Sequence, residues 1–245
     1  MPCQVFTRDI WQAEAVRPNL RHSQASSSDR GFSNVKLPCV AALDKSNGYE
    51  EIALTFISGR GQNHSGVGAS VVADWSQMLS AGATILDLGC GTGRPISQAL
   101  IERGFKVYGV DASPTMVAAF RANFPHVPVE CGAVQDSDFF GQTFDGVVAW
   151  GLLFLLDVEV QCRLIGKVAG VLRGGGRLLF TAPRRSCSWR DAMTGRISIS
   201  LGEEAYRKAL EAEGMSLVGT HCDEGENHYY FAQKIGAPSK LPHIA

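Results

Sequence analysis

The sequence has no long hydrophobic run and no excess of charge of one sign. None of its apolar segments approaches the roughly 18 uninterrupted residues that a membrane-spanning helix needs. Its first residues also lack the basic-then-apolar layout of a secretory signal. The 23 basic and 24 acidic residues give a net charge of -1, with no Lys/Arg stripe. These absences predict a cytoplasmic protein without a membrane partner, and they argue against nucleic acid as a partner.

Paired cysteines are absent as well. The seven cysteines are odd in number, scattered along the chain and never spaced as CxxC. This pattern is typical of reduced thiols and matches neither a disulfide framework nor a zinc site, so no bound metal is predicted. The cysteines are Cys3, Cys39, Cys90, Cys131, Cys162, Cys187 and Cys222.

The apolar content is sufficient for one domain with a substantial core, since 45% of the 245 residues are hydrophobic. Residues 1–46 show little periodicity and predict a flexible N-terminal extension. Residues 47–245 predict the folded domain, with a helical cap over 47–80 and a core over 83–235. The cap is expected to break around residues 58–62 and to pack apolar residues such as Leu54 and Trp75 on the core.

One segment carries most of the functional information. Residues 83–88 predict a short apolar strand that ends in Gly89, Gly91 and Gly93, where a helix over 94–103 begins. Glycines allow a sharp turn and let a ligand lie against the main chain. The next strand, over 106–110, places Asp111 at its C-terminal tip, where a carboxylate can accept the hydroxyl protons of a ribose. The pattern predicts a nucleotide-binding cradle.

The glycines alternate as GxGxG after Asp87, whereas the dinucleotide fingerprint is GxGxxG. In this the sequence resembles the class I S-adenosylmethionine-dependent methyltransferases. The resemblance implies S-adenosylmethionine as cofactor, with the loop near its methionine part and the acidic residue after the second strand on its ribose. The cofactor-binding residues that the resemblance implies are Asp87, Gly89, Gly91, Gly93 and Asp111. Further candidates for the cofactor site are Cys90, Ala112, Met116, Val134, Gln135 and Trp150.

The resemblance and the alternating pattern together predict an α/β fold. We expect a doubly wound, seven-stranded, mostly parallel sheet with an antiparallel C-terminal hairpin and an N-terminal helical lid. Further strands are expected over 128–133, 144–151, 177–183, 215–222 and 228–235. Three helix ends are also predicted: Ser113 caps a helix that ends before Pro125, Gly174 to Gly176 stop a helix over 158–172, and Ser200 with Glu203 forms a capping box.

The densest polar cluster lies at residues 221–230. It permits three interpretations: a solvated hairpin turn, a metal site whose spacing matches no standard ligand pattern, or part of a substrate site. In the last case His228 or Tyr229 acts as a base or orienting group. Trp150 permits two interpretations: its ring is close to the cofactor sulfonium, or it packs in the core.

No histidine follows the fourth strand, where many relatives carry a base; residues 151–156 are apolar after Gly151. The catalytic candidates are therefore His64, His228 and Tyr229, and the substrate-binding candidates are Tyr49, Arg60, Trp189 and Tyr230. We predict methyl transfer to a small-molecule acceptor. The alternatives are a protein or nucleic-acid methyltransferase, a non-catalytic cofactor-binding protein, and a nicotinamide-dependent oxidoreductase. The sequence does not indicate an oligomeric state.

Overall fold

The computed structural model describes residues 44–59 and 66–236, which fold around a seven-stranded sheet of order β3-β2-β1-β4-β5-β9-β8. Strands β1 to β5 run parallel, β9 is antiparallel to β5, and β8 is antiparallel to β9. The predicted fold class is confirmed. The strands are β1 (Thr84–Leu88), β2 (Lys106–Asp111), β3 (Val129–Cys131), β4 (Phe144–Ala149), β5 (Leu172–Thr181), β8 (Met215–Cys222) and β9 (His228–Lys234).

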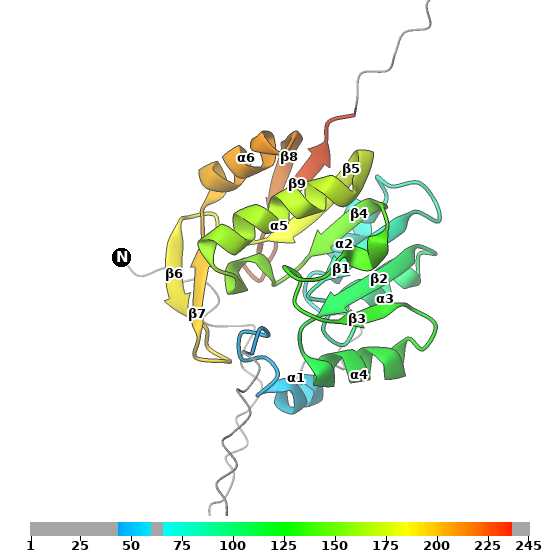
Figure 1. The fold of residues 1–245 in the computed structure, drawn as a ribbon, viewed down its shortest axis with the longest axis vertical. Coiled ribbons are helices and arrows are strands. Elements are labelled where there is room, and N and C mark those ends of the chain that lie inside the picture. The colour runs from blue at the N-terminus through cyan, green and yellow to red at the C-terminus, as the bar shows by residue number, and fades with distance from the viewer. Residues whose placement is uncertain (1–43, 60–65, 237–245) are drawn as a thin grey trace, which may run out of the picture.

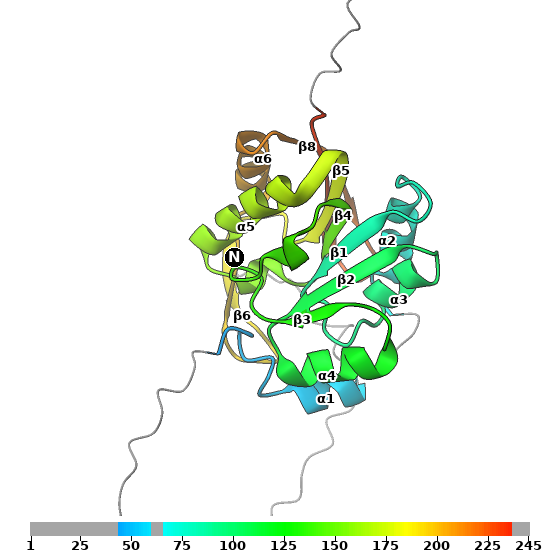
Figure 2. The same cartoon turned by 45° about the vertical axis from the view of Figure 1, so that its right-hand side comes forward.

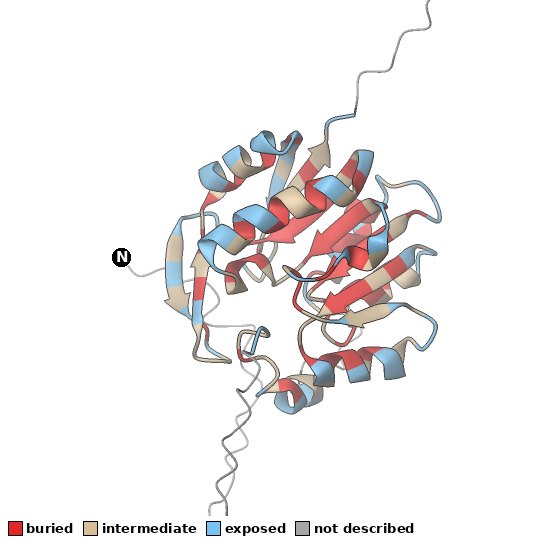
Figure 3. Ribbon diagram, in the orientation of Figure 1, coloured by how far each residue is buried: buried red, intermediate tan, exposed pale blue. Residues whose placement is uncertain are grey.

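Helices cover both faces of the sheet, as Figures 1 and 2 show. One core lies under α5 and α6, and the other lies under α2 and α3. The central strands are therefore almost wholly buried (Figure 3), which explains their nearly continuous apolar sequences. The helices are α1 (Ala53–Gly59), α2 (Ala69–Ser76), α3 (Ile96–Ile101), α4 (Pro114–Asn123), α5 (Val158–Val171) and α6 (Glu203–Ala212). Two 3-10 turns are η1 (Phe139–Gly141) and η2 (Leu153–Leu155).

The helix cap of α4 is as predicted, because the Ser113 side chain accepts a hydrogen bond from the Met116 amide and Pro114 opens the helix. The predicted capping box of α6 is wrong. Gly202 stands at its N-cap with a φ of 87°, and the Ser200 hydroxyl instead donates to the Pro183 carbonyl at 2.6 Å. An added Cβ on Gly202 would lie 2.7 Å from the Ser186 amide nitrogen, so a close chain approach determines this turn.

Strand β5 begins earlier than predicted. The chain leaves α5 at Leu172 in an extended conformation, and Gly174 to Gly176 belong to the strand instead of stopping the helix. The ladder between β4 and β5 shifts register here. A Cβ on Gly176 would lie 2.9 Å from the Arg173 carbonyl oxygen and 3.2 Å from that of Asp145. The glycines therefore permit an irregular, tightly packed start to the strand.

A two-stranded sheet was not predicted. Strands β6 (Cys187–Arg190) and β7 (Ile197–Ser200), which follow β5 and precede α6 in the chain, form an antiparallel pair at the left of Figure 1. In the cap, Trp75 is buried as expected, but Leu54 is 76% exposed, so its predicted core packing is wrong. Of the expected break between the two helices, residues 60–62 lie outside the described residues. No helix within the described ranges is long and apolar enough to span a membrane.

Candidate functional site

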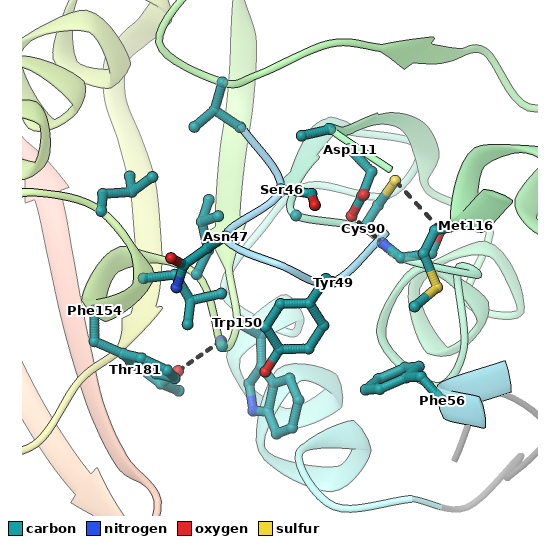
Figure 4. Close-up of a pocket in the computed structure, with 18 of the residues that line it drawn as sticks. Ser46, Asn47, Tyr49, Phe56, Cys90, Asp111, Met116, Trp150, Phe154 and Thr181 are labelled. Atoms are coloured by element: carbon teal, nitrogen blue, oxygen red, sulfur yellow. Dashed lines mark hydrogen bonds between the residues drawn. The ribbon is translucent and has the colours of Figure 1, made fainter. Parts of the chain in front are cut away.

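A cavity of about 220 Å³ opens at the carboxyl ends of β1, β2 and β4. Open α/β sheets bind ligands at this edge because the strand-to-helix loops converge there. Figure 4 shows Asp111, Cys90 and Met116 on one side of the cavity and Phe154 and Thr181 on the other. The cavity is thus a single space with two chemically different sides.

The glycine loop forms part of the first side. Gly89, Gly91 and Gly93 all have positive φ, at 70°, 52° and 80°. Gly91 lines the cavity, and an added Cβ there would meet no atom within 4 Å. Gly93 is not among the lining residues; its Cβ would lie 2.6 Å from the Phe124 ring. The loop therefore leaves space for a ligand at Gly91 and packs tightly at Gly93.

Asp111 connects the glycine loop to the start of α4. One carboxylate oxygen accepts from the Gly91 amide at 2.8 Å, and the other accepts from the Ser113 amide at 2.9 Å. Burial raises the pKa of this carboxyl and the charge of Glu50 adds to the rise, while the two amide hydrogen bonds act in the opposite direction. Asp111 thus orients the loop, and its remaining lone pairs face the cavity that it lines.

Replacing Asp111 by asparagine is expected to weaken cofactor binding by about 1.5–3 kcal/mol, the scale of hydrogen bonds to a charged group. The asparagine oxygen still accepts one backbone amide, so the protein should stay folded. Calorimetric titration together with a melting curve separates the two effects. Unchanged affinity in a folded variant would show that the ribose is bound elsewhere.

Asp87 lies beneath the loop and is 2% exposed. The Ser97 hydroxyl donates to it at 2.6 Å. Burial, helped by the charge of Asp111, raises the pKa of the Asp87 carboxyl to about 7. Burial and the same two carboxylates also raise the thiol pKa of neighbouring Cys90, so this cysteine is a neutral packing group. A carboxylate held here has no cationic partner among the described residues unless a ligand supplies one.

The loop after β3 forms another wall, to which Val134 and Gln135 contribute beside Ala112 and Met116 of the α4 start. The Gln135 side-chain oxygen is buried without a hydrogen-bond partner. Lys167 of α5 donates to the carbonyls of Val134 and Gln135 at 3.2 Å each, and also to Ser137. The sequence did not reveal this lysine, because it is distant in the chain and its role depends on the packing of α5.

Trp150 lies between the two sides (Figure 4). Its indole N–H donates to the Tyr229 hydroxyl at 3.2 Å, and that hydroxyl donates to Asp223 at 2.7 Å. The backbone of Gly68 packs on the indole, since an added Cβ would lie 2.5 Å from its nitrogen. Part of the polar cluster of residues 221–230 therefore anchors Trp150, and Tyr229 is placed as a positioning residue outside the cavity lining.

Changing Tyr229 to phenylalanine should remove the hydrogen bond that orients Trp150. We expect cofactor affinity to fall by about 0.5–1.5 kcal/mol, the usual net value of one hydrogen bond, and the fluorescence response of Trp150 to ligand to change. Tyr230 to phenylalanine is the matched control, because its hydroxyl makes only a 3.4 Å contact with the Pro183 carbonyl. Equal effects in the two variants would contradict the positioning role.

The other predicted residues divide into three groups. Tyr49 and Trp189 line the cavity. Tyr230 does not, since it is fully buried and stacked on Phe180 with ring centroids 4.6 Å apart. His228 packs edge-on against Tyr230 and is likewise absent from the lining; burial lowers its pKa. Arg60 and His64 lie outside the described residues.

The second side of the cavity is mostly apolar and was largely missed. We call this part the acceptor half, after the acceptor that we propose for it below. The run of apolar residues after Gly151 was a sequence signal for this apolar wall. From that run we inferred only that no histidine follows the fourth strand. The residues of the acceptor half are Asn47, Tyr49, Leu152, Phe154, Leu155, Leu156, Thr181, Trp189, Arg190, Asp191, Ala192 and Asn227.

A segment before α1, residues 44–51, crosses the cavity and is called the strap. Arg196, in the connection between β6 and β7, forms ion pairs with Asp44 at 3.2 Å and with Glu51 at 3.0 Å. Lys45 forms an ion pair with Asp136 at 2.5 Å, and Glu50 accepts from the Thr115 hydroxyl at 2.7 Å. These contacts hold the strap against three separate elements. The last residues of the predicted extension therefore lie at the cavity, while residues 1–43 are outside the described part.

Within the described ranges, no group of three or more His, Cys, Asp or Glu side chains is arranged to hold a metal ion. The middle of the polar cluster, residues 223–227, instead forms the turn between β8 and β9. Asp223 accepts from the amides of Gly225 and Asn227 at 3.0 and 2.9 Å and from the Asn227 side chain.

Comparison with known proteins identifies the domain. Residues 85–176 match the methyltransferase domain family. An uncharacterized methyltransferase of Mycobacterium bovis is 35% identical over 105 residues, which cover 43% of this chain and 41% of that protein. The chain thus matches less than half the length of this relative.

Two solved structures share the fold. An amino pentose methyltransferase from Micromonospora echinaspora, with S-adenosylmethionine bound, has a TM-score of 0.58 at 21% identity and covers 75% of this chain and 96% of its own. The Burkholderia thailandensis 1,6-didemethyltoxoflavin-N1-methyltransferase has a TM-score of 0.62 at 19% identity, covering 86% and 98%. The chain therefore carries a methyltransferase domain over residues 85–176, which confirms the predicted methyltransferase family for that domain, and the two solved structures show the fold that it shares.

Proposed function

We propose that this chain transfers the methyl group of S-adenosylmethionine to a small-molecule acceptor. The observation that carries the proposal is the continuity of the cavity: the glycine loop and Asp111 border the same space as the apolar acceptor half. Trp150 lies between the two sides. A cofactor and an acceptor that occupy the two sides are neighbours within one site.

The chain's own residues fit this cofactor. The open space at Gly91 admits a ligand against the backbone, and Asp111 offers lone pairs to a ribose. The buried Asp87 carboxylate suits the ammonium group of the methionine part, which would supply the missing cation. The unpartnered Gln135 oxygen suits the amino group of an adenine. Each assignment is a proposal drawn from an unsatisfied or open feature of the cavity.

S-adenosylmethionine supplies a methyl group already activated by a positively charged sulfur, so this chain's residues need chiefly to align the acceptor and exclude water. The apolar residues Leu152, Phe154 and Leu155 make the acceptor half poor in water-binding groups. The strap covers the cavity from the other side. The Trp150 ring, anchored by Tyr229, offers a π-face near which a cation is stabilised.

No histidine lines the cavity within the described residues. The carboxylate of Asp191 lies in the acceptor half, but one of its oxygens already accepts from the amides of Met193 and Thr194 at 2.9 and 2.8 Å. We therefore assign no general base. The acceptor atom should be nucleophilic without deprotonation by the chain, or lose its proton readily to water.

The strap also favours a small acceptor over a macromolecule. Its three anchor points, at Arg196, Asp136 and Thr115, hold it across the cavity, and a polymer segment would have to displace it. The net charge of -1 provides no general attraction for nucleic acid. Both features support the small-molecule alternative.

The test uses methyl-labelled S-adenosylmethionine with the full-length protein and a dialysed or undialysed cell extract. The label is expected in the low-mass fraction, and only with the undialysed extract. Label in precipitated protein or nucleic acid would refute the proposal in favour of a macromolecular acceptor. Cofactor binding without transfer in any fraction would favour a non-catalytic binding protein. A variant that cannot bind the cofactor, Gly91→Val, provides the background.

A further inference from the structure

We infer that the acceptor is a planar, uncharged and largely apolar molecule that accepts a hydrogen bond from the side-chain amide of Asn47. The inference rests on the proposed function and names the substrate class of the same site. It makes Asn47 a residue that determines specificity, alongside the aromatic wall opposite the strap.

Asn47 is the polar residue that the strap contributes with an unused donor. Its φ of 53° is in the left-handed region, which asparagine tolerates better than most residues. Its side-chain nitrogen is buried and has no hydrogen-bond partner. Figure 4 shows the side chain directed from the strap toward the side where Phe154 and Thr181 lie. A ligand atom that accepts this hydrogen bond would satisfy a group that the protein leaves unpaired.

Two buried side-chain amides among the described residues are satisfied, whereas the Gln135 oxygen, which also belongs to the cavity lining, is unpaired like the Asn47 nitrogen. Asn227 donates to both oxygens of Asp223, at 3.0 and 2.9 Å. Gln161 donates to the carbonyls of Leu156 and Ile199 at 2.8 and 2.9 Å. Buried polar groups are normally paired, and an unpaired one calls for an explanation, of which a functional role is one. The unpaired amide at the acceptor half therefore indicates recognition of a ligand.

Planarity and low polarity follow from the wall of the acceptor half. The rings of Phe154 and Trp189 lie with centroids 5.4 Å apart and planes tilted by 45°. Leu152, Leu155 and Leu156 extend the same surface. Aromatic walls interact best with flat ring systems that stack or meet them edge-to-face, and aliphatic side chains favour apolar partners.

The charged groups of the acceptor half and of the adjoining strap are already engaged. Lys45 pairs with Asp136, and Arg190 donates to the Gly195 carbonyl at 2.6 Å. The Asp191 carboxylate accepts from the backbone of the turn that follows it. Each of these three side chains in the acceptor half and the strap therefore already has a hydrogen-bond or ion-pair partner. A charged acceptor would lose its hydration there and would have to compete with these contacts for an ion pair.

Binding of probe acceptors to the protein saturated with S-adenosylhomocysteine tests the inference by calorimetry. The probes are an uncharged dihydroxynaphthalene and a hydroxyquinoline, compared with a hydroxynaphthoate and with tyramine. The uncharged bicyclic probes should bind at least about tenfold more tightly than the charged ones, the scale of one uncompensated polar group. Equal or weaker binding of the uncharged probes would overturn the inference.

Two variants test Asn47 itself. Asn47→Asp keeps the shape and the tolerance for left-handed backbone but removes the N–H donors, so binding of the uncharged probes should fall about tenfold. Asp136→Asn removes the Lys45 ion pair and leaves the amide in place. A loss of equal size in both variants, or none in Asn47→Asp, would refute the role of the amide.

The two proposals can fail separately. If S-adenosylhomocysteine does not bind, or if labelled methyl enters only macromolecules, the proposed function fails and this inference fails with it. If small molecules are methylated but only charged or aliphatic ones, the proposed function stands and the acceptor class named here is wrong.

Discussion

Replacing Gly91 by valine should abolish binding of S-adenosylmethionine while leaving the protein folded. The position of an added Cβ at Gly91 is open, with no protein atom within 4 Å, and Gly91 lines the cavity. The new side chain therefore occupies ligand space without displacing protein atoms. Valine is strained in the left-handed backbone conformation at this position, where φ is 52°. We expect this strain to lower the free energy of unfolding by about 1–3 kcal/mol. Calorimetry is expected to show affinity lower by at least about 100-fold.

Gly93→Ala is the matched control, because it lies in the same loop and should behave in the opposite way. A methyl group there would lie 2.6 Å from the Phe124 ring and 2.9 Å from that of Phe120. We expect a loss of folding free energy of about 2–5 kcal/mol from overpacking and backbone strain. Retained cofactor binding in Gly91→Val would mean that the loop is only a turn and that the ligand lies elsewhere.

Replacing Asp87 by asparagine should stabilise the cofactor-free protein at neutral and higher pH, and weaken cofactor binding. Burial raises the pKa of this carboxyl from 3.8 to about 7, so its ionised form is disfavoured in the folded state. The asparagine amide has a similar shape and no charge. The variant's free energy of unfolding is expected to rise by a few kcal/mol. The upper limit is about 1.4 kcal/mol for each unit by which the folded-state pKa of Asp87 exceeds the unfolded-state pKa.

The pH dependence gives this prediction its sign. Since the folded-state pKa of Asp87 is above the unfolded one, the folded protein binds the proton more tightly between pH 3.8 and about 7. The contribution of the Asp87 carboxyl to the free energy of unfolding therefore falls as pH rises through that interval, and it stays at the lower value above it. The difference in unfolding free energy between Asp87→Asn and the unchanged protein should be largest near pH 8 and much smaller near pH 4.

Denaturant unfolding at the two pH values measures this difference, and comparison with the variant cancels the titration of all other groups. Cofactor affinity measured at pH 8 should fall by about 1.5–3 kcal/mol if the carboxylate meets the ammonium group of the ligand. A variant that is less stable at pH 8 would show that the Asp87 charge is compensated in the folded protein. A variant with full affinity would remove Asp87 from the proposed cofactor site.

The parts of the fold that the sequence predicted depend on local signals. The apolar runs of β1 and β4, the Ser113-Pro114 helix start and the glycine loop are each read within about ten residues, and the structure contains all of them. Where local signals allowed more than one outcome, tertiary packing decided. Gly176 belongs to a strand in which an added Cβ would meet two carbonyl groups, and the Ser200 hydroxyl donates to the Pro183 carbonyl instead of capping α6.

The missed parts of the site depend on contacts between distant segments. Glu50 bonds to Thr115, Arg196 bonds to Asp44, and Lys167 bonds to the loop after β3. Nothing near these residues in the chain indicates their partners, because only the closed fold brings them together. The catalytic candidates His228 and Tyr229 were attractive for their chemistry alone, and the structure places both outside the cavity lining.

Calorimetric titration of the full-length protein with S-adenosylmethionine, S-adenosylhomocysteine and NAD tests the central claim most directly. The glycine loop, Asp87 and Asp111 predict one site of micromolar affinity for the first two ligands, lost in Gly91→Val, and no measurable binding of NAD. Binding of NAD in preference to both adenosyl ligands, or adenosyl binding that survives in Gly91→Val, would contradict the account.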